Sequence, residues 1–88
     1  MKIFNKEDYG KMMDLELSNF LRENTDGFDR SKVSLETNIS FETLTKVSNR
    51  KRNLTEGNSI GIVKLILIAK ENHSKRMERA EQLIINKS

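Results

Sequence analysis

The chain has 88 residues with a formal net charge of +3, and it contains neither cysteine nor proline. Such a length corresponds to one small domain, and the lack of cysteine excludes disulfides and thiolate metal sites. The longest apolar stretch, residues 60–69, is interrupted by Lys64 and is shorter than the roughly 20 residues of a membrane span. The N-terminus lacks the apolar run of a secretion signal, so we expect a cytoplasmic protein with no membrane partner.

The charge is distributed unevenly along the chain. Residues 28–53 carry six basic and three acidic side chains, a local charge of +3, whereas residues 1–27 have a local charge of −2. This basic middle segment is weak evidence for nucleic-acid binding, because most charged faces of proteins are only solvated.

The pattern of apolar residues predicts an all-α fold. No segment alternates apolar and polar residues for long enough to form a sheet, and good helix formers are abundant. A first helix is predicted to begin at its cap Asp8 and to end in the turn 24–27, with one broad apolar face formed by Met12, Met13, Leu17, Phe20 and Leu21. The pattern leaves open whether residues 1–13 join this helix or form a separate arm.

Two short helices follow. The second is predicted to begin at Asp29 or Ser31 and to end at Asn38, because asparagine tolerates a left-handed backbone. Ser40 is the predicted cap of the third helix, which extends to about residue 52 and is amphipathic.

A fourth helix is predicted to begin at Asn58 or Ser59, after a loop that contains Gly57. Apolar side chains surround residues 60–69, which indicates burial on more than one side. A charged helix over 73–88 either continues the fourth helix or turns back on it at His73-Ser74.

The C-terminal helix has an apolar stripe of its own, formed by Met77, Ala80, Leu83 and Ile84. A stripe of this kind packs either within the monomer or at a dimer seam, and the short chain leaves both possibilities open. The chain therefore divides into a domain over 1–72 and a candidate dimerisation element over 73–88.

Residues 30–49 have the spacing of a helix-turn-helix. The motif needs a small residue where its helices cross, a residue able to adopt a left-handed conformation four positions later, and apolar residues that pin the second helix. Ser34 is the small residue, Asn38 is the residue that can be left-handed, and the apolar positions are Val33, Ile39, Leu44 and Val47. The segment Ser48-Asn49-Arg50-Lys51-Arg52 follows. From about Leu17 to Lys70 the chain strongly resembles the Cro and phage-repressor class of regulators, the XRE family, in which Gly usually stands in place of Arg50.

The resemblance implies a compact four- to five-helix lambda-repressor-like domain with a C-terminal helix. It also implies that the third helix, about 40–52, lies in the major groove of double-stranded operator DNA. The base-contact candidates are then Ser40, Phe41, Glu42, Thr45 and Lys46, and the phosphate-contact candidates are Arg30, Ser31, Lys32, Asn49, Arg50, Lys51 and Arg52. Arg30 and Ser31 are expected at the start of the second helix, where backbone N–H groups favour a phosphate.

The function that the resemblance implies is that of a small transcription regulator of phage or mobile-element type. It would bind its operator as a homodimer, with two half-sites one helical turn apart. An enzyme is not expected, because one histidine, no cysteine, no phosphate-binding glycine loop and no convincing carboxylate pair leave no catalytic constellation. We likewise expect no cofactor and no metal site.

Phe41 and Glu42 are unusual residues for a helix that reads DNA. Glutamate can accept a hydrogen bond from cytosine N4 and phenylalanine can pack on a thymine methyl, so the pair is able to read bases. Alternatively, Phe41 packs beside Ile39 or at a subunit contact, and Glu42 is only solvated. An exposed aromatic residue also suits a module that binds another protein, such as an antirepressor or an inhibitor of a host defence protein.

Overall fold

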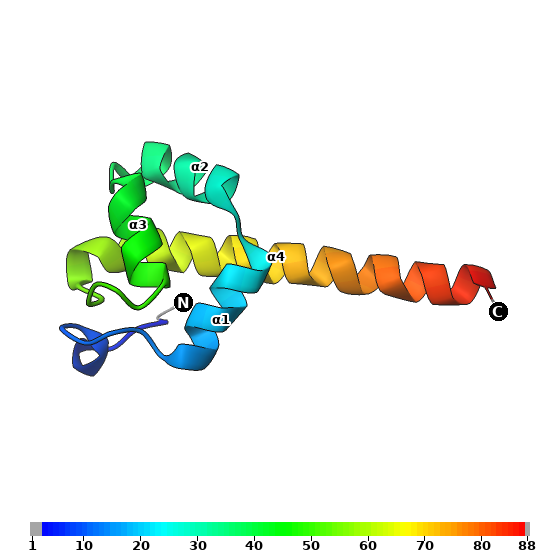
Figure 1. Ribbon diagram of the computed structural model, residues 1–88, viewed down its shortest axis with the longest axis horizontal. Coiled ribbons are helices and arrows are strands. Elements are labelled where there is room, and N and C mark those ends of the chain that lie inside the picture. Colours follow the sequence, from blue (N-terminus) through cyan, green and yellow to red (C-terminus); the bar gives the residue numbers. More distant parts are fainter. Residues whose placement is uncertain (1–2, 88) are drawn as a thin grey trace.

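Four α-helices and one turn of 3-10 helix make up the protein in a computed structural model that describes residues 3–87 (Figure 1). The elements are η1 (Lys6–Asp8), α1 (Leu15–Asn24), α2 (Gly27–Thr37), α3 (Phe41–Ser48) and α4 (Glu56–Lys87). This part of the chain contains no strand, so the predicted all-α class is confirmed. Residues 1, 2 and 88 of the predicted terminal segments lie outside the described residues.

Helix α1 begins later than predicted. Its cap is Asp14, whose carboxylate accepts a hydrogen bond from the Leu17 N–H at 3.1 Å. The carboxylate of Asp8 instead accepts from the Asn5 N–H at 2.7 Å and closes η1. Both aspartates are good caps by type, and the extended conformation of the chain between them decides which one begins the long helix.

That extended chain is paired with the segment that precedes α4. The Gly10 N–H donates to the Leu54 carbonyl at 2.7 Å, and the Leu54 N–H donates to the Lys11 carbonyl at 2.8 Å. Gly10 has a φ of 84°, which a residue with a side chain rarely adopts. Phe4 and Met13 are buried, so the N-terminal segment belongs to the core and is not a free arm.

Helix α2 begins at Gly27, before the predicted start at Asp29 or Ser31. Asp26 and Asp29 form a capping box, in which each carboxylate accepts from the backbone N–H of the other residue, at 3.0 and 3.1 Å. Asp29 therefore lies within the first turn. The helix ends at Asn38, which has a φ of 62° as predicted.

Helix α3 has the predicted cap but is shorter than predicted. The Ser40 Oγ accepts from the Thr43 N–H at 3.1 Å, and the helix ends at Ser48 rather than near residue 52. Arg50 has a φ of 59°, and the Lys51 N–H donates to the Lys46 carbonyl at 2.8 Å. This left-handed closure of the helix end places residues 49–52 in a turn.

Helix α4 is continuous and has no joint at His73-Ser74 (Figure 1). Its start lies earlier than the predicted Asn58 or Ser59. The Thr55 hydroxyl accepts from the Asn58 N–H at 3.1 Å, and the Asn58 side chain accepts from the Thr55 N–H at 2.8 Å. Because α4 extends without interruption from Glu56 to Lys87, the predicted boundary between residues 72 and 73 is not a break in secondary structure.

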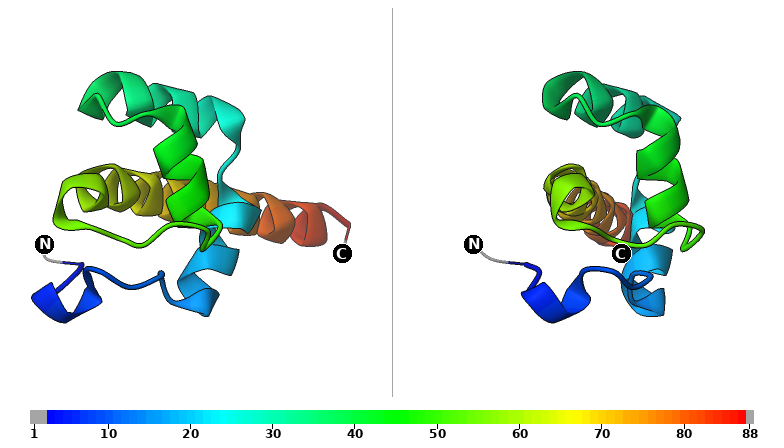
Figure 2. Two further views of the ribbon diagram at one scale, coloured as in Figure 1. Left: turned by 60° about the vertical axis from the view of Figure 1, so that its left-hand side comes forward. Right: turned by 90° about the vertical axis from the view of Figure 1, so that its left-hand side faces the viewer.

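The core lies between the first half of α4 and the other three helices. The largest fully buried side chains are those of Leu21, Val33, Leu44, Val47, Leu54, Ile62 and Leu65. Figure 2 shows α1, α2 and α3 grouped beside α4, which then extends beyond them. Ile60 and Leu67 are 59% and 48% exposed, so the prediction that α4 is buried on more than one side is wrong for these two residues.

Within residues 3–87 there is no helix with both the length and the apolar character needed to cross a membrane.

Candidate nucleic-acid interface

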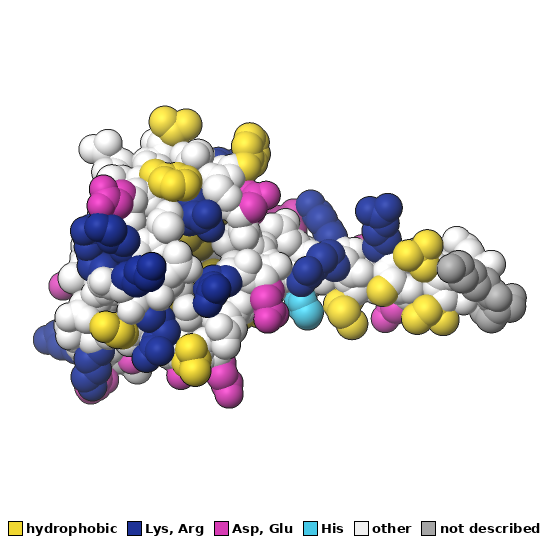
Figure 3. Space-filling view, in the orientation of Figure 1, with side chains coloured by type: hydrophobic (Ala, Val, Ile, Leu, Met, Phe, Trp, Pro, Cys, Tyr) yellow, Lys and Arg dark blue, Asp and Glu magenta, His cyan; other side chains and the backbone are white. Residues whose placement is uncertain are grey.

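Helix α3 and the turn after it carry most of the predicted DNA contacts. Leu44, Val47 and Ser48 are buried, and the other positions of this short helix are exposed or half-buried. Lys and Arg side chains gather over α3 and the following turn in the view of Figure 3. The outer face of α3 is therefore exposed and lies within a basic region.

The position of α3 is fixed by a close crossing with α4 at Gly61. A Cβ atom at Gly61 would lie 2.6 Å from Leu44 Cδ2 and 3.0 Å from Ile39 Cδ1. The sequence pattern assigned the small residue of the motif to Ser34, which is half-buried, and missed Gly61. A glycine inside an apolar helical stretch was the signal that could have identified it, because such a glycine often has a packing role.

Ser40, the first base-contact candidate, is engaged in capping α3. Its hydroxyl accepts from the Thr43 N–H and donates to Thr43 Oγ1 at 2.8 Å. Thr43 Oγ1 also accepts from the Arg52 guanidinium at 2.8 Å. Arg52 thus folds back over the first turn of α3, a position that the sequence pattern did not indicate, and Thr43 is a residue of the site that the pattern missed.

Phe41 packs toward α2. The Arg30 guanidinium lies over its ring, 5.5 Å from the centroid, and a Cβ atom at Gly27 would be 3.9 Å from Phe41 Cζ. Phe41 as a whole residue is 42% exposed, so it remains accessible at the surface. Arg30 and Phe41 therefore form one cation–π unit that joins the beginnings of α2 and α3.

The expectation that Arg30 and Ser31 begin the second helix is wrong. The Arg30 N–H already donates to the Asp26 carbonyl at 3.1 Å, and the first turn ahead of it is closed by the carboxylates of Asp26 and Asp29. Two acidic side chains at this helix end disfavour a phosphate there. Ser31 and Lys32 are exposed in the second turn, so Lys32 is left to contact a phosphate through its side chain.

Glu42 and Lys46 form an ion pair on the outer face of α3. Their oxygen and nitrogen atoms are 2.6 Å apart, one helical turn from each other. The hydrogen bond and the positive charge of Lys46, with a smaller effect from Arg52, lower the pKa of the Glu42 carboxyl below its ordinary value of 4.5. Glu42 is therefore an ionised hydrogen-bond acceptor at neutral pH.

Thr45 is half-buried, and its hydroxyl oxygen is covered by neighbouring atoms without a hydrogen-bond partner among the described residues. Only other atoms of Thr45 reach the surface, so the hydroxyl is not in a position to contact a base. This placement narrows the polar base-contact candidates on α3 to Glu42 and Lys46.

In the turn after α3, one basic side chain makes a structural hydrogen bond and two are exposed to solvent. The Arg50 Nε donates to the Met13 carbonyl at 2.7 Å, so this half-buried arginine fastens the N-terminal segment to the turn. Asn49, Lys51 and Arg52 are exposed on the same turn. Of the predicted phosphate contacts here, Arg50 is thus occupied by a structural bond, and Lys51 and Arg52 face solvent.

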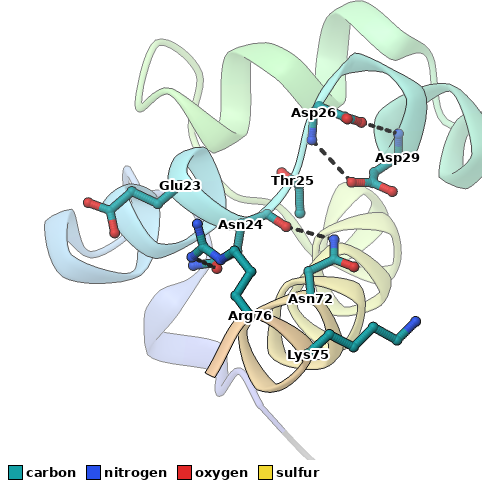
Figure 4. A pocket seen from close by; sticks show the side chains of 8 residues that line it. All are labelled: Glu23, Asn24, Thr25, Asp26, Asp29, Asn72, Lys75 and Arg76. Atoms are coloured by element: carbon teal, nitrogen blue, oxygen red, sulfur yellow. Dashed lines mark hydrogen bonds between the residues drawn. The ribbon is translucent and has the colours of Figure 1, made fainter. Parts of the chain in front are cut away.

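A hollow between the α1–α2 connection and α4 lies away from these residues (Figure 4). The Asn72 amide donates to the Asn24 carbonyl at 2.8 Å, and the Arg76 guanidinium donates to Asn24 Oδ1. These bonds join α4 to the end of α1. The residues that line the hollow therefore connect α4 to α1 and fix the direction in which α4 leaves the domain.

The dimer candidates lie beyond the contact of Asn72 and Arg76 with Asn24. Met77, Leu83 and Ile84 are 53%, 54% and 69% exposed, and Ala80 is exposed as well. They form part of the segment of α4 that extends from the domain, which we call the arm and define as residues 77–87 (Figure 1). The structure brings them together on the arm and keeps them apart from the α3 face.

Comparison of the chain with protein-family models, with curated proteins and with solved structures found no match.

Proposed function

We propose that this protein is a small sequence-specific DNA-binding transcription regulator, of phage or mobile-element type, that works in the cytoplasm. Helix α3 would enter the major groove of a double-stranded operator, and two copies would bind as a homodimer. The observation that carries the proposal is the α2–turn–α3 unit. Asn38 is left-handed and Ser40 caps α3, while the Glu42–Lys46 face remains exposed beside cations.

Different residues of this face would read bases and bind phosphates. Glu42, ionised and acceptor-only, suits the N4 amino group of cytosine, and the exposed part of the Phe41 ring suits a thymine methyl. Lys46 can donate to a guanine edge with hydrogen atoms that its ion pair does not use. Lys32, Lys51 and Arg52 would hold phosphates, which fixes register without reading sequence.

Selection from a random duplex library, followed by fluorescence anisotropy across a salt series, tests this function. We expect one enriched sequence family that binds at least about a thousandfold more tightly than random duplex. Affinity should fall steeply with salt, because each neutralised phosphate releases counterions. Weak and equal binding to every duplex would refute the proposal.

Two variants separate base reading from phosphate binding. Glu42→Gln should change which sequences are preferred more than it changes overall affinity. Lys51→Gln should weaken binding to all sequences alike and lower the salt slope by about one. If Glu42→Gln tightens binding uniformly and leaves preference unchanged, Glu42 only repels phosphate.

A protein-binding function is the second candidate, and an exposed patch on α2 favours it. Phe28 and Leu35 are 79% and 88% exposed and lie two turns apart, hence on one side of the helix. An antirepressor or an inhibitor of a host defence protein would use such residues as anchors. In that case selection enriches no duplex, and Phe28→Ser combined with Leu35→Ser abolishes the biological effect of the protein, whereas Glu42→Gln does not.

A further inference from the structure

The apolar stripe of the arm lies on the same side of α4 as the core. Five turns of α-helix take about 18 residues, so residues at that spacing point in the same direction. Ala80, Leu83 and Ile84 follow Ile62, Leu65 and Ile66 at this spacing. The three earlier residues are buried against the other helices, at 0%, 0% and 6% exposure. The arm therefore repeats the core-facing stripe beyond the end of the domain.

The arm presents this stripe in a fixed direction. The bonds from Asn72 and Arg76 to Asn24 hold α4 immediately before the arm begins. In Figure 3 hydrophobic side chains are visible along the extended part of α4. Beside the arm is thus a space that the domain closes at one end and that is open at the other.

We propose that the arm of a second copy of this chain fills this space, packed antiparallel. A parallel partner in register would have to place its own residues 62–69 where α1, α2 and α3 of the first copy already lie. An antiparallel partner ends where the domain begins, so the two domains lie at opposite ends of the pair. The proposal deepens the homodimer of the proposed function, but the contact itself involves no DNA.

Three of the four stripe residues are symmetric about Ala80, whereas the counterpart of Ile84, four residues on the other side of Ala80, is Arg76. Met77 and Leu83 are each three residues from Ala80, so a two-fold axis at Ala80 places Met77 level with the partner's Leu83. The small side chain at the centre allows the helices to approach closely, and the larger side chains on both sides fill the contact. At Met77, Ala80 and Leu83 an antiparallel pair of arms is thus self-complementary in side-chain size.

The charges beside the stripe provide a test of orientation. Arg79 and Glu81 flank the stripe on opposite sides, since each is one residue from Ala80 and the helix turns by about 100° per residue. An antiparallel pair brings Glu81 close to the partner's Glu81, whereas a parallel pair would bring it close to the partner's Arg76. Repulsion between exposed carboxylates is weak and screened by salt, and it does not outweigh the overlap of whole helices that a parallel pair requires.

The contact is small compared with the roughly 800 Å² per partner of a stable interface, because only a few side chains on each arm take part. We therefore expect a reversible dimer, which sedimentation equilibrium can detect as a mass that rises with protein concentration. Leu83→Asp should weaken the dimer at least tenfold, and Gln82→Asp, on the opposite side of the arm, should not. Circular dichroism of both variants checks that α4 is intact. A monomeric mass at every concentration would overturn the proposal.

Cysteine crosslinking decides the orientation, and the absence of native cysteine makes the background clean. With diamide as oxidant, a mixture of Met77→Cys and Leu83→Cys chains should form a disulfide between the two kinds of chain. Met77→Cys alone should not crosslink, because the two sites would be about 9 Å apart along the pair, far beyond disulfide geometry. Efficient crosslinking of Met77→Cys alone would overturn the antiparallel arrangement.

The dependence of dimer affinity on salt and on the charge of Glu81 is an independent check of the antiparallel orientation. Added salt and Glu81→Gln should both strengthen an antiparallel dimer, and both would weaken a parallel one. None of these measurements uses DNA. A failure to bind DNA would therefore refute the proposed function and leave this inference intact. A failure of the arms to pair would overturn this inference and leave DNA binding by α3 to be judged on its own measurement.

Discussion

Gly61 is the residue whose replacement tests the crossing of α3 over α4. A methyl group there would meet the Leu44 side chain at 2.6 Å, and Leu44 is fully buried with little room to move. We expect Gly61→Ala to destabilise the fold by about 1–2 kcal/mol, since overpacking costs more than the roughly 1 kcal/mol that alanine gains as a better helix former. Urea unfolding followed by circular dichroism measures the change.

Gly57 is the matched control on the same helix. A Cβ atom at this position would find only Thr55 Oγ1 within 4 Å, at 3.9 Å. Gly57→Ala should therefore leave stability unchanged or raise it by up to about 1 kcal/mol, through helix propensity alone. Equal effects of the two substitutions would contradict a tight contact at Gly61.

The Glu42–Lys46 pair can be tested by titration. Lys46 lowers the pKa of Glu42, so in the folded protein this carboxyl should titrate below 4.5 when its carbon resonance is followed by NMR. In Lys46→Gln the pKa should move back toward 4.5. Because a lowered pKa favours the folded state only while the group is ionised, the stabilising effect is complete above about pH 4.5 and is lost as pH falls through the folded pKa.

Lys51→Gln provides the comparison for this titration, because Lys51 lies in the nearby turn and is not a partner of Glu42 in the ion pair. It should change the pKa of Glu42 much less than Lys46→Gln does. Equal shifts in the two variants would mean that the general positive field, and not the specific pair, lowers the pKa.

The N-terminal segment is part of the fold. Met13 is 3% exposed and its carbonyl holds Arg50, whereas its neighbour Met12 is 52% exposed. Met13→Ala should destabilise the protein by about 2–5 kcal/mol, the usual cost of a cavity, and Met12→Ala should change stability by less than about 0.5 kcal/mol. Thermal unfolding of the two variants makes the comparison, and similar melting temperatures would show that the segment packs only loosely.

The antiparallel pair of arms predicts the spacing of the half-sites in an operator. Helix α3 crosses α4 at the level of Gly61, and the proposed two-fold axis lies at Ala80. At about 1.5 Å per residue, the two α3 helices would lie roughly 55–60 Å apart along the pair. This separation is incompatible with half-sites one helical turn, about 34–36 Å, apart.

Two turns, about 68–72 Å, are the nearest spacing at which both half-sites lie on the same face of DNA, and we expect the operator to bend to make up the difference of roughly 10–15 Å. Footprinting on duplexes in which the spacing of the selected half-site is varied measures this. Tightest binding at one turn would contradict the arrangement of the two domains, even if each copy binds a half-site as proposed.

Local features of α2 and α3 were predictable because they depend on neighbours in sequence. Asn38 is left-handed and Ser40 caps α3, as their residue types indicate, and the buried side of α3 follows from the spacing of Leu44 and Val47. For the candidate site, the sequence indicated Phe41, Glu42 and their neighbours but not their partners. The cation–π contact between Arg30 and Phe41 links two helices, and no local pattern contains it.

The all-α class, the turn between α2 and α3, and the burial of Leu44 and Val47 follow from local sequence, because helix periodicity and capping act over a few residues. Local sequence did not reveal that Asp14 rather than Asp8 begins α1, that Arg50 holds the N-terminal segment, that the Thr45 hydroxyl is covered, or that α4 continues past His73 as one helix. These outcomes depend on contacts between residues far apart in the chain. Such contacts choose among local alternatives of similar free energy.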